Sequence, residues 1–150
     1  MLKNNFIILT ITLILSQISF SFSAEKFLSL KKNKVNVRYG PSFDFPVKYI
    51  YEKKNLPIKQ IDKKENFRRI IDYKKNSGWI HISQLKKINS VIAIDDKIMF
   101  KKSTIFSEPI AKIKQGRLLV ILKCEVEWCK VESENFKGWV SKDNLWGVIN

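Results

Sequence analysis

The two cysteines are the side chains with the clearest chemistry, and they lie at either end of the segment "CEVEWC". If residues 118–123 and 128–133 are hairpin partners, Cys124 and Cys129 face each other at the ~5 Å Cα separation of directly opposed strand residues. A disulfide spans about that distance, so we expect a structural disulfide. Two thiolates and one distant histidine are too few ligands for a metal site, and redox pairs are more often spaced C-x-x-C.

The other titratable side chains give little indication of catalysis. His81 is the single histidine, and it shares a strand face with Trp79 because the two are separated by one residue. It either flanks a ligand groove or is a half-exposed residue at the rim of a sheet. The sequence contains no zinc-protease helix, nucleophile elbow or phosphate-binding glycine loop. We therefore expect neither an enzyme nor a cofactor.

Residues 1–23 have the layout of a secretory signal peptide. Lys3 is their only charged residue, and an apolar run extends from position 6 to 18. That run is shorter than the ~20 residues that span a bilayer. We expect cleavage after Ser23 or Ala24, and we favour the periplasm over release from the cell as the destination.

The chain is strongly basic, with a net charge of +14, and removing residues 1–23 leaves +13. Such an excess attracts anionic lipid or acidic wall polymers, whereas an exported protein seldom meets nucleic acid. Only four basic residues are arginines, at positions 38, 68, 69 and 117. Because phosphate sites favour the arginine fork, a lysine excess that reflects codon bias alone is an open alternative.

After Ala24 the sequence reads as short β-strands separated by Asn, Gly, Pro and charged residues. The string "GWIHISQL" at 78–85 returns as "GWVSKDNL" at 138–145. This echo predicts two copies of one small barrel, at 24–88 and 89–150, with Ile98 and Phe100 corresponding to Val35 and Val37. The junction, 87–96, is expected to be an extended strand packed between the copies.

The strings "VNVRYGPS" and "GWIHISQL" resemble the start and end of bacterial SH3-like (SH3b) domains. The second copy is similar to the divergent half of exported two-repeat members. The resemblance implies an all-β fold, with two tandem small SH3-like barrels after a signal peptide. It also implies a non-catalytic role in binding peptidoglycan, peptides or envelope proteins.

Aromatic residues of the first copy fall in segments that border the groove of SH3-type barrels. We expect ligand contacts from Phe43, Phe45, Tyr49, Trp79 and His81, because aromatic grooves hold extended peptides or sugar faces. The leading hypothesis is a monomeric adaptor that recognises peptidoglycan or an extended peptide or protein partner. The alternative is an electrostatic binder of anionic lipid or acidic polymer. The second copy keeps only Phe106 in the corresponding loop, so we expect the first to recognise and the second to brace.

Overall fold

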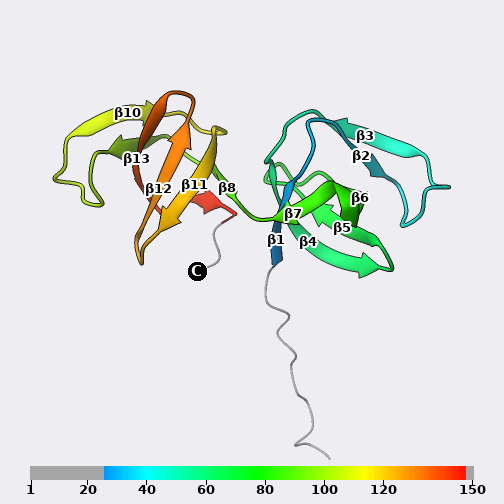
Figure 1. The fold of residues 1–150 in the computed structure, drawn as a ribbon. Coiled ribbons are helices and arrows are strands. Elements are labelled where there is room, and N and C mark those ends of the chain that lie inside the picture. Colours follow the sequence, from blue (N-terminus) through cyan, green and yellow to red (C-terminus); the bar gives the residue numbers. More distant parts are fainter. Residues whose placement is uncertain (1–25, 148–150) are drawn as a thin grey trace, which may run out of the picture.

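The structure is a computed structural model that describes residues 26–147; the predicted signal peptide lies outside the described residues. Two lobes lie side by side, and each is one strongly curved antiparallel sheet of seven strands (Figure 1). The predicted all-β fold with two SH3-like barrels is confirmed. Within the described range, no helix has the length and apolar character needed to cross a membrane.

The first sheet has the strand order β3-β2-β6-β5-β4-β1-β7. Its strands are β1 (Lys26–Leu30), β2 (Val35–Arg38), β3 (Val47–Tyr51), β4 (Pro57–Lys64), β5 (Phe67–Ile71), β6 (Ser77–His81) and β7 (Leu85–Lys87). A single turn of 3-10 helix, η2 (Ile82–Gln84), connects β6 to β7. Along β2 and β6 alternate residues are buried, which directs one face of each strand into the core.

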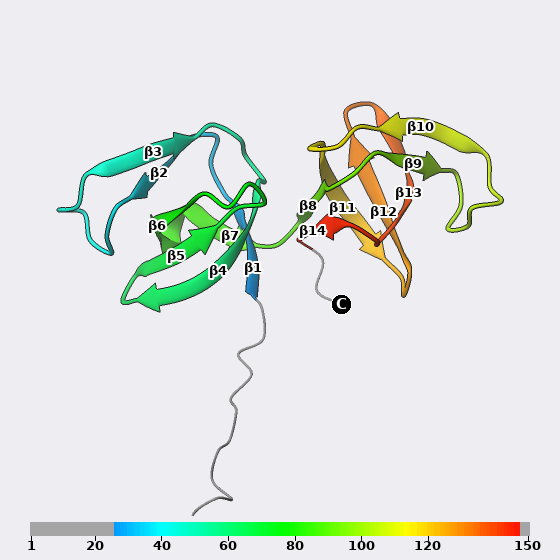
Figure 2. The same cartoon turned by 180° about the vertical axis from the view of Figure 1, so that it is seen from behind.

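The second sheet repeats this topology strand for strand, in the order β10-β9-β13-β12-β11-β8-β14. Its strands are β8 (Ser90–Ala93), β9 (Lys97–Phe100), β10 (Pro109–Ile113), β11 (Leu118–Cys124), β12 (Trp128–Ser133), β13 (Phe136–Ser141) and β14 (Leu145–Trp146). Figure 2 shows from behind that the β2–β3 and β9–β10 hairpins lie at opposite outer ends of the molecule. The echo in the sequence therefore reflects two copies of one architecture.

The expected disulfide is present. Cys124 and Cys129 are cross-strand partners at the end of the β11–β12 hairpin, and their sulfur atoms are bonded. The hairpin tip between them is exposed, including Val126 at 84%. The bond therefore closes a tip in which most side chains face solvent.

The two glycines of the echo occupy the same place in their sheets. Gly78 is paired with Ile70, and Gly138 is paired with Val131. A Cβ at Gly138 would lie 2.5 Å from Met99, as one at Gly78 would lie 2.4 Å from Val37. At either position the neighbouring strand, β2 or β9, lies too close to the glycine backbone to leave room for a side chain.

This equivalence corrects the predicted register of β9. Met99 is fully buried in the position of Val37, whereas Ile98 is 49% exposed. The predicted correspondence of Ile98 and Phe100 to Val35 and Val37 was wrong by one residue. Three successive apolar residues, Ile98, Met99 and Phe100, give no alternation that could identify the inner face.

Strand β8 packs between the barrels as an extended strand, as expected. All four of its residues are buried. Ile92 joins the core of the first barrel, whereas Val91 and Ala93 join the core of the second. One short strand therefore contributes side chains to both cores.

Polar contacts complete the junction. The buried hydroxyls of Ser29 and Ser90 lie 3.1 Å apart, and the Ser90 hydroxyl also bonds the carbonyl of Asn55. Trp146 packs edge-on against Phe27 with ring centroids 5.2 Å apart. Its indole nitrogen donates to the carbonyl of Pro57 at 3.2 Å. The second barrel thereby braces the first through both its first and last strands.

Candidate functional site

The outer face of β6 presents Trp79 and His81, while Gly78 and Ile80 are buried on the inner face. Strand alternation places the two rings on one side, as predicted. On the neighbouring strand β5, Phe67 is paired with His81 and Arg69 with Trp79. The outer face therefore carries aromatic and cationic side chains next to each other.

Three rings form a cluster at one end of this face. Phe43 lies 5.2 Å from Phe67 and 5.1 Å from His81, measured between ring centroids. Phe67 is buried beneath them, whereas Phe43 is 62% exposed. We name Phe43, Phe67, Trp79 and His81 the aromatic strip. Phe67 was absent from the predicted set because the sequence places it in a strand without showing which way its side chain points.

Arg38 organises the loop that brings Phe43 to the strip. Its Nη1 atom donates to the carbonyls of Phe43 and Phe45, at 3.2 and 2.7 Å, and its guanidinium lies over the Phe43 ring. The Phe45 ring covers Gly40, where an added Cβ would lie 2.5 Å from it. The Phe45 ring therefore packs on its own loop, and its carbonyl is bonded to Arg38.

Tyr49, another predicted ligand residue, is placed away from the strip. It packs against the core of the first barrel, and its hydroxyl lies 3.3 Å from that of Tyr51, which donates to Asp72. Burial raises the pKa of both tyrosines. The Asp72 carboxylate, 3% exposed, also accepts bonds from the backbone of Lys74 and Asn76. The structure therefore unites Phe43, Trp79 and His81, but not Tyr49.

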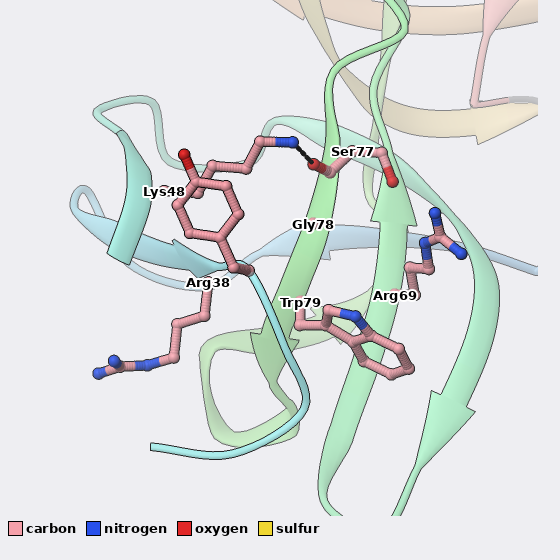
Figure 3. A pocket seen from close by; sticks show the side chains of 7 residues that line it. Arg38, Lys48, Arg69, Ser77, Gly78 and Trp79 are labelled. Carbon is pink, nitrogen blue, oxygen red and sulfur yellow. Dashed lines mark hydrogen bonds between the residues drawn. The ribbon is translucent and has the colours of Figure 1, made fainter. Parts of the chain in front are cut away.

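Beside Trp79 the surface is hollowed into a pocket of about 330 Å³ (Figure 3). We name its lining residues the cationic pocket: Arg38, Tyr39, Lys48, Arg69, Ser77, Gly78 and Trp79. Lys48 extends over the Tyr39 ring and donates to the Ser77 carbonyl at 3.0 Å. Figure 3 shows the Arg38 side chain running away from Trp79, so Arg38 contributes mainly its stem. No acidic residue is among the lining residues.

Arg69 is the least constrained cation of the pocket. It is exposed, and among residues 26–147 it has no hydrogen-bond or ion-pair partner. Asp62 is its cross-strand neighbour on β4, but the structure shows no ion pair between the two side chains; the Asp62 carboxylate accepts the backbone N–H of Lys63 at 2.7 Å. The guanidinium donors of Arg69 are therefore available to a ligand.

The second barrel treats its equivalent tryptophan differently. Lys123 lies over the Trp139 ring, 4.8 Å from the centroid, and Trp139 is only 8% exposed. In the first barrel, Asp62 occupies the place of Lys123 in the strand register and leaves Trp79 half-buried. Trp79 is therefore more accessible than Trp139, which Lys123 covers.

A second, more apolar hollow of about 260 Å³ lies in the second barrel. It is lined by Asp96, Lys97, Ile98, Phe100, Ile105, Trp128 and Ser141. Trp128 and Ser141 are cross-strand partners, as Phe67 and His81 are in the first barrel. The first barrel fills the corresponding place with the Phe43 ring, so the two outer faces differ in chemistry as well as in shape.

Comparison with known families agrees with this repeated architecture. The model of the bacterial SH3 domain family matches residues 31–87 and 99–147. The chain belongs to the bacterial SH3 domain family. The first matched segment lies in the first sheet and the second matched segment in the second sheet. Bacterial SH3 domains are typically non-catalytic binding modules, and among the described residues no cluster of His, Cys, Asp and Glu could hold a metal ion.

Solved structures with a similar course of the chain include NlpC2 and NlpC1 from Trichomonas vaginalis. Their sequence identities are 13% and 14%, and the TM-score is 0.38 for each. The alignments cover 83% and 88% of this chain but 49% of each solved chain, so the protein spans about half their length. No curated protein matches the chain.

Proposed function

We propose that this bacterial SH3 protein is an exported, non-catalytic binding module of the cell envelope. Its ligand is peptidoglycan or an extended peptide of an envelope partner, held on the outer face of β6. The observation that carries this proposal is the aromatic strip, in which Phe43 and the two outward residues of β6 lie on one surface. Rigid rings that keep an apolar face in water favour extended peptides and sugar faces.

The placement of the strip suits recognition. The loop that carries Phe43 is fixed by two hydrogen bonds from Arg38, and β6 is a central strand with neighbours on both sides. A surface fixed before binding loses less side-chain freedom when the ligand arrives. The second barrel supports the first barrel elsewhere in its sheet, where Trp146 contacts Phe27 of β1 and Pro57 of β4.

The competing proposal is attraction by charge alone, which the net charge of +14 favours. Binding of that kind depends on the number of cations near an anionic surface and weakens steeply with salt. It requires no particular aromatic residue. The two proposals therefore predict opposite results for a variant that gains a positive charge while losing access to Trp79.

Asp62→Lys is such a variant, because Lys123 covers Trp139 from the equivalent position. The experiment is sedimentation of the protein lacking residues 1–23 with isolated peptidoglycan sacculi across a salt series. We expect Asp62→Lys and Trp79→Ala to reduce retention at physiological salt. Phe106→Ala, which removes a ring that is 92% exposed in the second barrel, is the matched control and should bind normally.

Stronger retention of Asp62→Lys at low salt, with loss of binding by the unaltered protein and the variants at physiological salt, would establish the electrostatic mode instead. Normal binding by Trp79→Ala with an intact fold would show that the aromatic strip does not bind the ligand. Retention of the full-length protein inside the cell would contradict the export that the proposal assumes.

A further inference from the structure

Trp79 belongs both to the aromatic strip and to the cationic pocket, so the two surfaces meet at one residue. A ligand that lies along the strip would reach this pocket at the Trp79 end. The pocket offers donors from Arg69, Lys48 and Tyr39, and no carboxylate lines it. Its chemistry is therefore different from that of the Phe43 end.

We propose that the cationic pocket binds an anionic oxygen group carried on a sugar ring, with the ring stacked on Trp79 and the anion paired with Arg69 and Lys48. The inference rests on the proposed function, since it names the chemistry of the ligand at one end of the same surface. Aromatic side chains take up the flat face of a sugar. A guanidinium fork matches both carboxylate and phosphate oxygens.

Arginine usage supports this assignment. The chain has four arginines among 28 basic residues, and two of them, Arg38 and Arg69, flank Trp79 as cross-strand partners on either side. Lysine supplies most of the positive charge in the rest of the molecule. The Arg38 guanidinium is occupied by its own loop, whereas the Arg69 guanidinium has no hydrogen-bond or ion-pair partner among the described residues.

Lys48 is held in a position to assist. One of its three donors bonds the Ser77 carbonyl at 3.0 Å, and its ammonium lies 5.6 and 6.0 Å from the ring centroids of Tyr39 and Tyr49. The remaining N–H groups are available to an anion in the pocket. Lys48 and Arg69 both line the pocket, so an anion held there meets one fixed ammonium and one guanidinium without an ion-pair partner among the described residues.

The second barrel serves as an internal comparison. The place of Arg69 is taken by Lys130, and Lys123 covers the tryptophan. A hollow of that barrel is the more apolar one beside Trp128. The open tryptophan and the pocket rich in donors therefore occur together in the first barrel.

The experiment titrates three matched sugars into the ¹⁵N-labelled protein lacking residues 1–23, and follows the Trp79 indole resonance. N-acetylglucosamine has no charge, N-acetylmuramic acid adds a carboxylate, and N-acetylglucosamine 6-phosphate adds a phosphate. We expect at least one charged sugar to bind about tenfold more tightly than the neutral one, the scale of one charge-assisted hydrogen bond. Which charged sugar binds better identifies carboxylate or phosphate as the source of the anion.

Arg69→Gln should abolish that difference. Arg117→Gln, in the second barrel and paired with Glu134, should retain the difference. Equal affinity for all three sugars, or an equal loss in the Arg117 variant, would overturn the inference. If the protein still binds sacculi in that case and the binding requires Trp79, the proposed function stands without this inference. If the protein also fails to bind sacculi, both proposals are overturned.

Discussion

Val37 on β2 lies directly against the backbone of Gly78 on β6, so closely that a Cβ at position 78 would come within 2.4 Å of its Cγ1 atom. The same added atom would lie 3.0 Å from the carbonyl oxygen of Arg38. The close contact lies beside the paired residues Arg38 and Trp79. It explains why glycine precedes tryptophan in the echoed motif.

Gly78→Ala is expected to destabilise the protein by about 1–3 kcal/mol, the usual cost of overpacking. Combining it with Val37→Ala should cost less than the sum of the two single changes, because removing the valine methyl groups makes room for the new Cβ. Urea unfolding of the two single variants and the double variant measures this coupling. Strict additivity would show that the contact does not determine the choice of glycine.

Gly138→Ala should be at least as damaging. Its Cβ would lie 2.5 Å from Met99, and also 2.7 Å from the backbone carbonyl oxygen of Phe100. A flexible methionine can move, but the backbone of a paired strand cannot do so without breaking β9–β13 pairing. A Met99→Ala change should therefore rescue Gly138→Ala less completely than Val37→Ala rescues Gly78→Ala. Equal rescue in thermal unfolding would contradict this reasoning.

Trp146→Ala should weaken the connection between the barrels. The change removes the hydrogen bond to the Pro57 carbonyl and the edge contact with Phe27. Together these contribute about 1–3 kcal/mol. We expect the single unfolding transition to broaden or split when tryptophan fluorescence and circular dichroism are compared. Phe106→Ala, which alters an exposed ring, should leave both probes coincident.

Reduction of the Cys124–Cys129 disulfide should cost about 2 kcal/mol, at the lower end of the usual range, because the loop that it closes is short. The bond lies at the tip of the β11–β12 hairpin, in the barrel that does not contain Trp79. A Cys124→Ser/Cys129→Ser variant should therefore lose stability in urea while it retains ligand affinity. A parallel loss of affinity would place the hairpin tip in the binding surface.

Acid should selectively weaken the turn that follows β8. The Asp96 carboxylate accepts bonds from the Gln115 backbone and the Lys114 ammonium, and these hold its pKa below the ordinary 3.8, at about 2. A lowered pKa stabilises the folded state above the ordinary value, and this contribution is lost as the pH falls from about 3.8 to about 2. Asp96→Asn should therefore lower the melting temperature at pH 7 and make little difference below about pH 2. A constant difference across this range would contradict the assignment.

The fold could be predicted from the sequence to a large extent because its signals are local. The echo of Gly78–Trp79 at 138–139 reflects a backbone contact that only glycine allows, and the spacing of Cys124 and Cys129 reflects strand opposition in a hairpin. The one-residue error at Ile98 arose where apolar residues occupy both faces of β9. Burial then depends on the neighbouring strand and not on alternation.

The site was less predictable because it depends on contacts across the sheet. Trp79 and His81 lie on one strand, so alternation related them correctly. The convergence of Arg69 and Lys48 on Trp79 depends on pairing among β2, β3, β5 and β6. Tyr49 lies away from the strip because it is paired with Val37 on β2 and packs against the core of the first barrel, and this depends on the register between β2 and β3.

The most direct test of the account uses the indole N–H resonances of the four tryptophans, at positions 79, 128, 139 and 146. The ¹⁵N-labelled protein lacking residues 1–23 would be titrated with soluble fragments released from peptidoglycan by a muramidase. We expect the Trp79 resonance to shift in a saturable manner at physiological salt, while the resonances of Trp139, beneath Lys123, and Trp146, at the junction, remain unchanged. Saturable binding that moves Trp128 or Trp146 and leaves Trp79 unchanged would contradict this expectation.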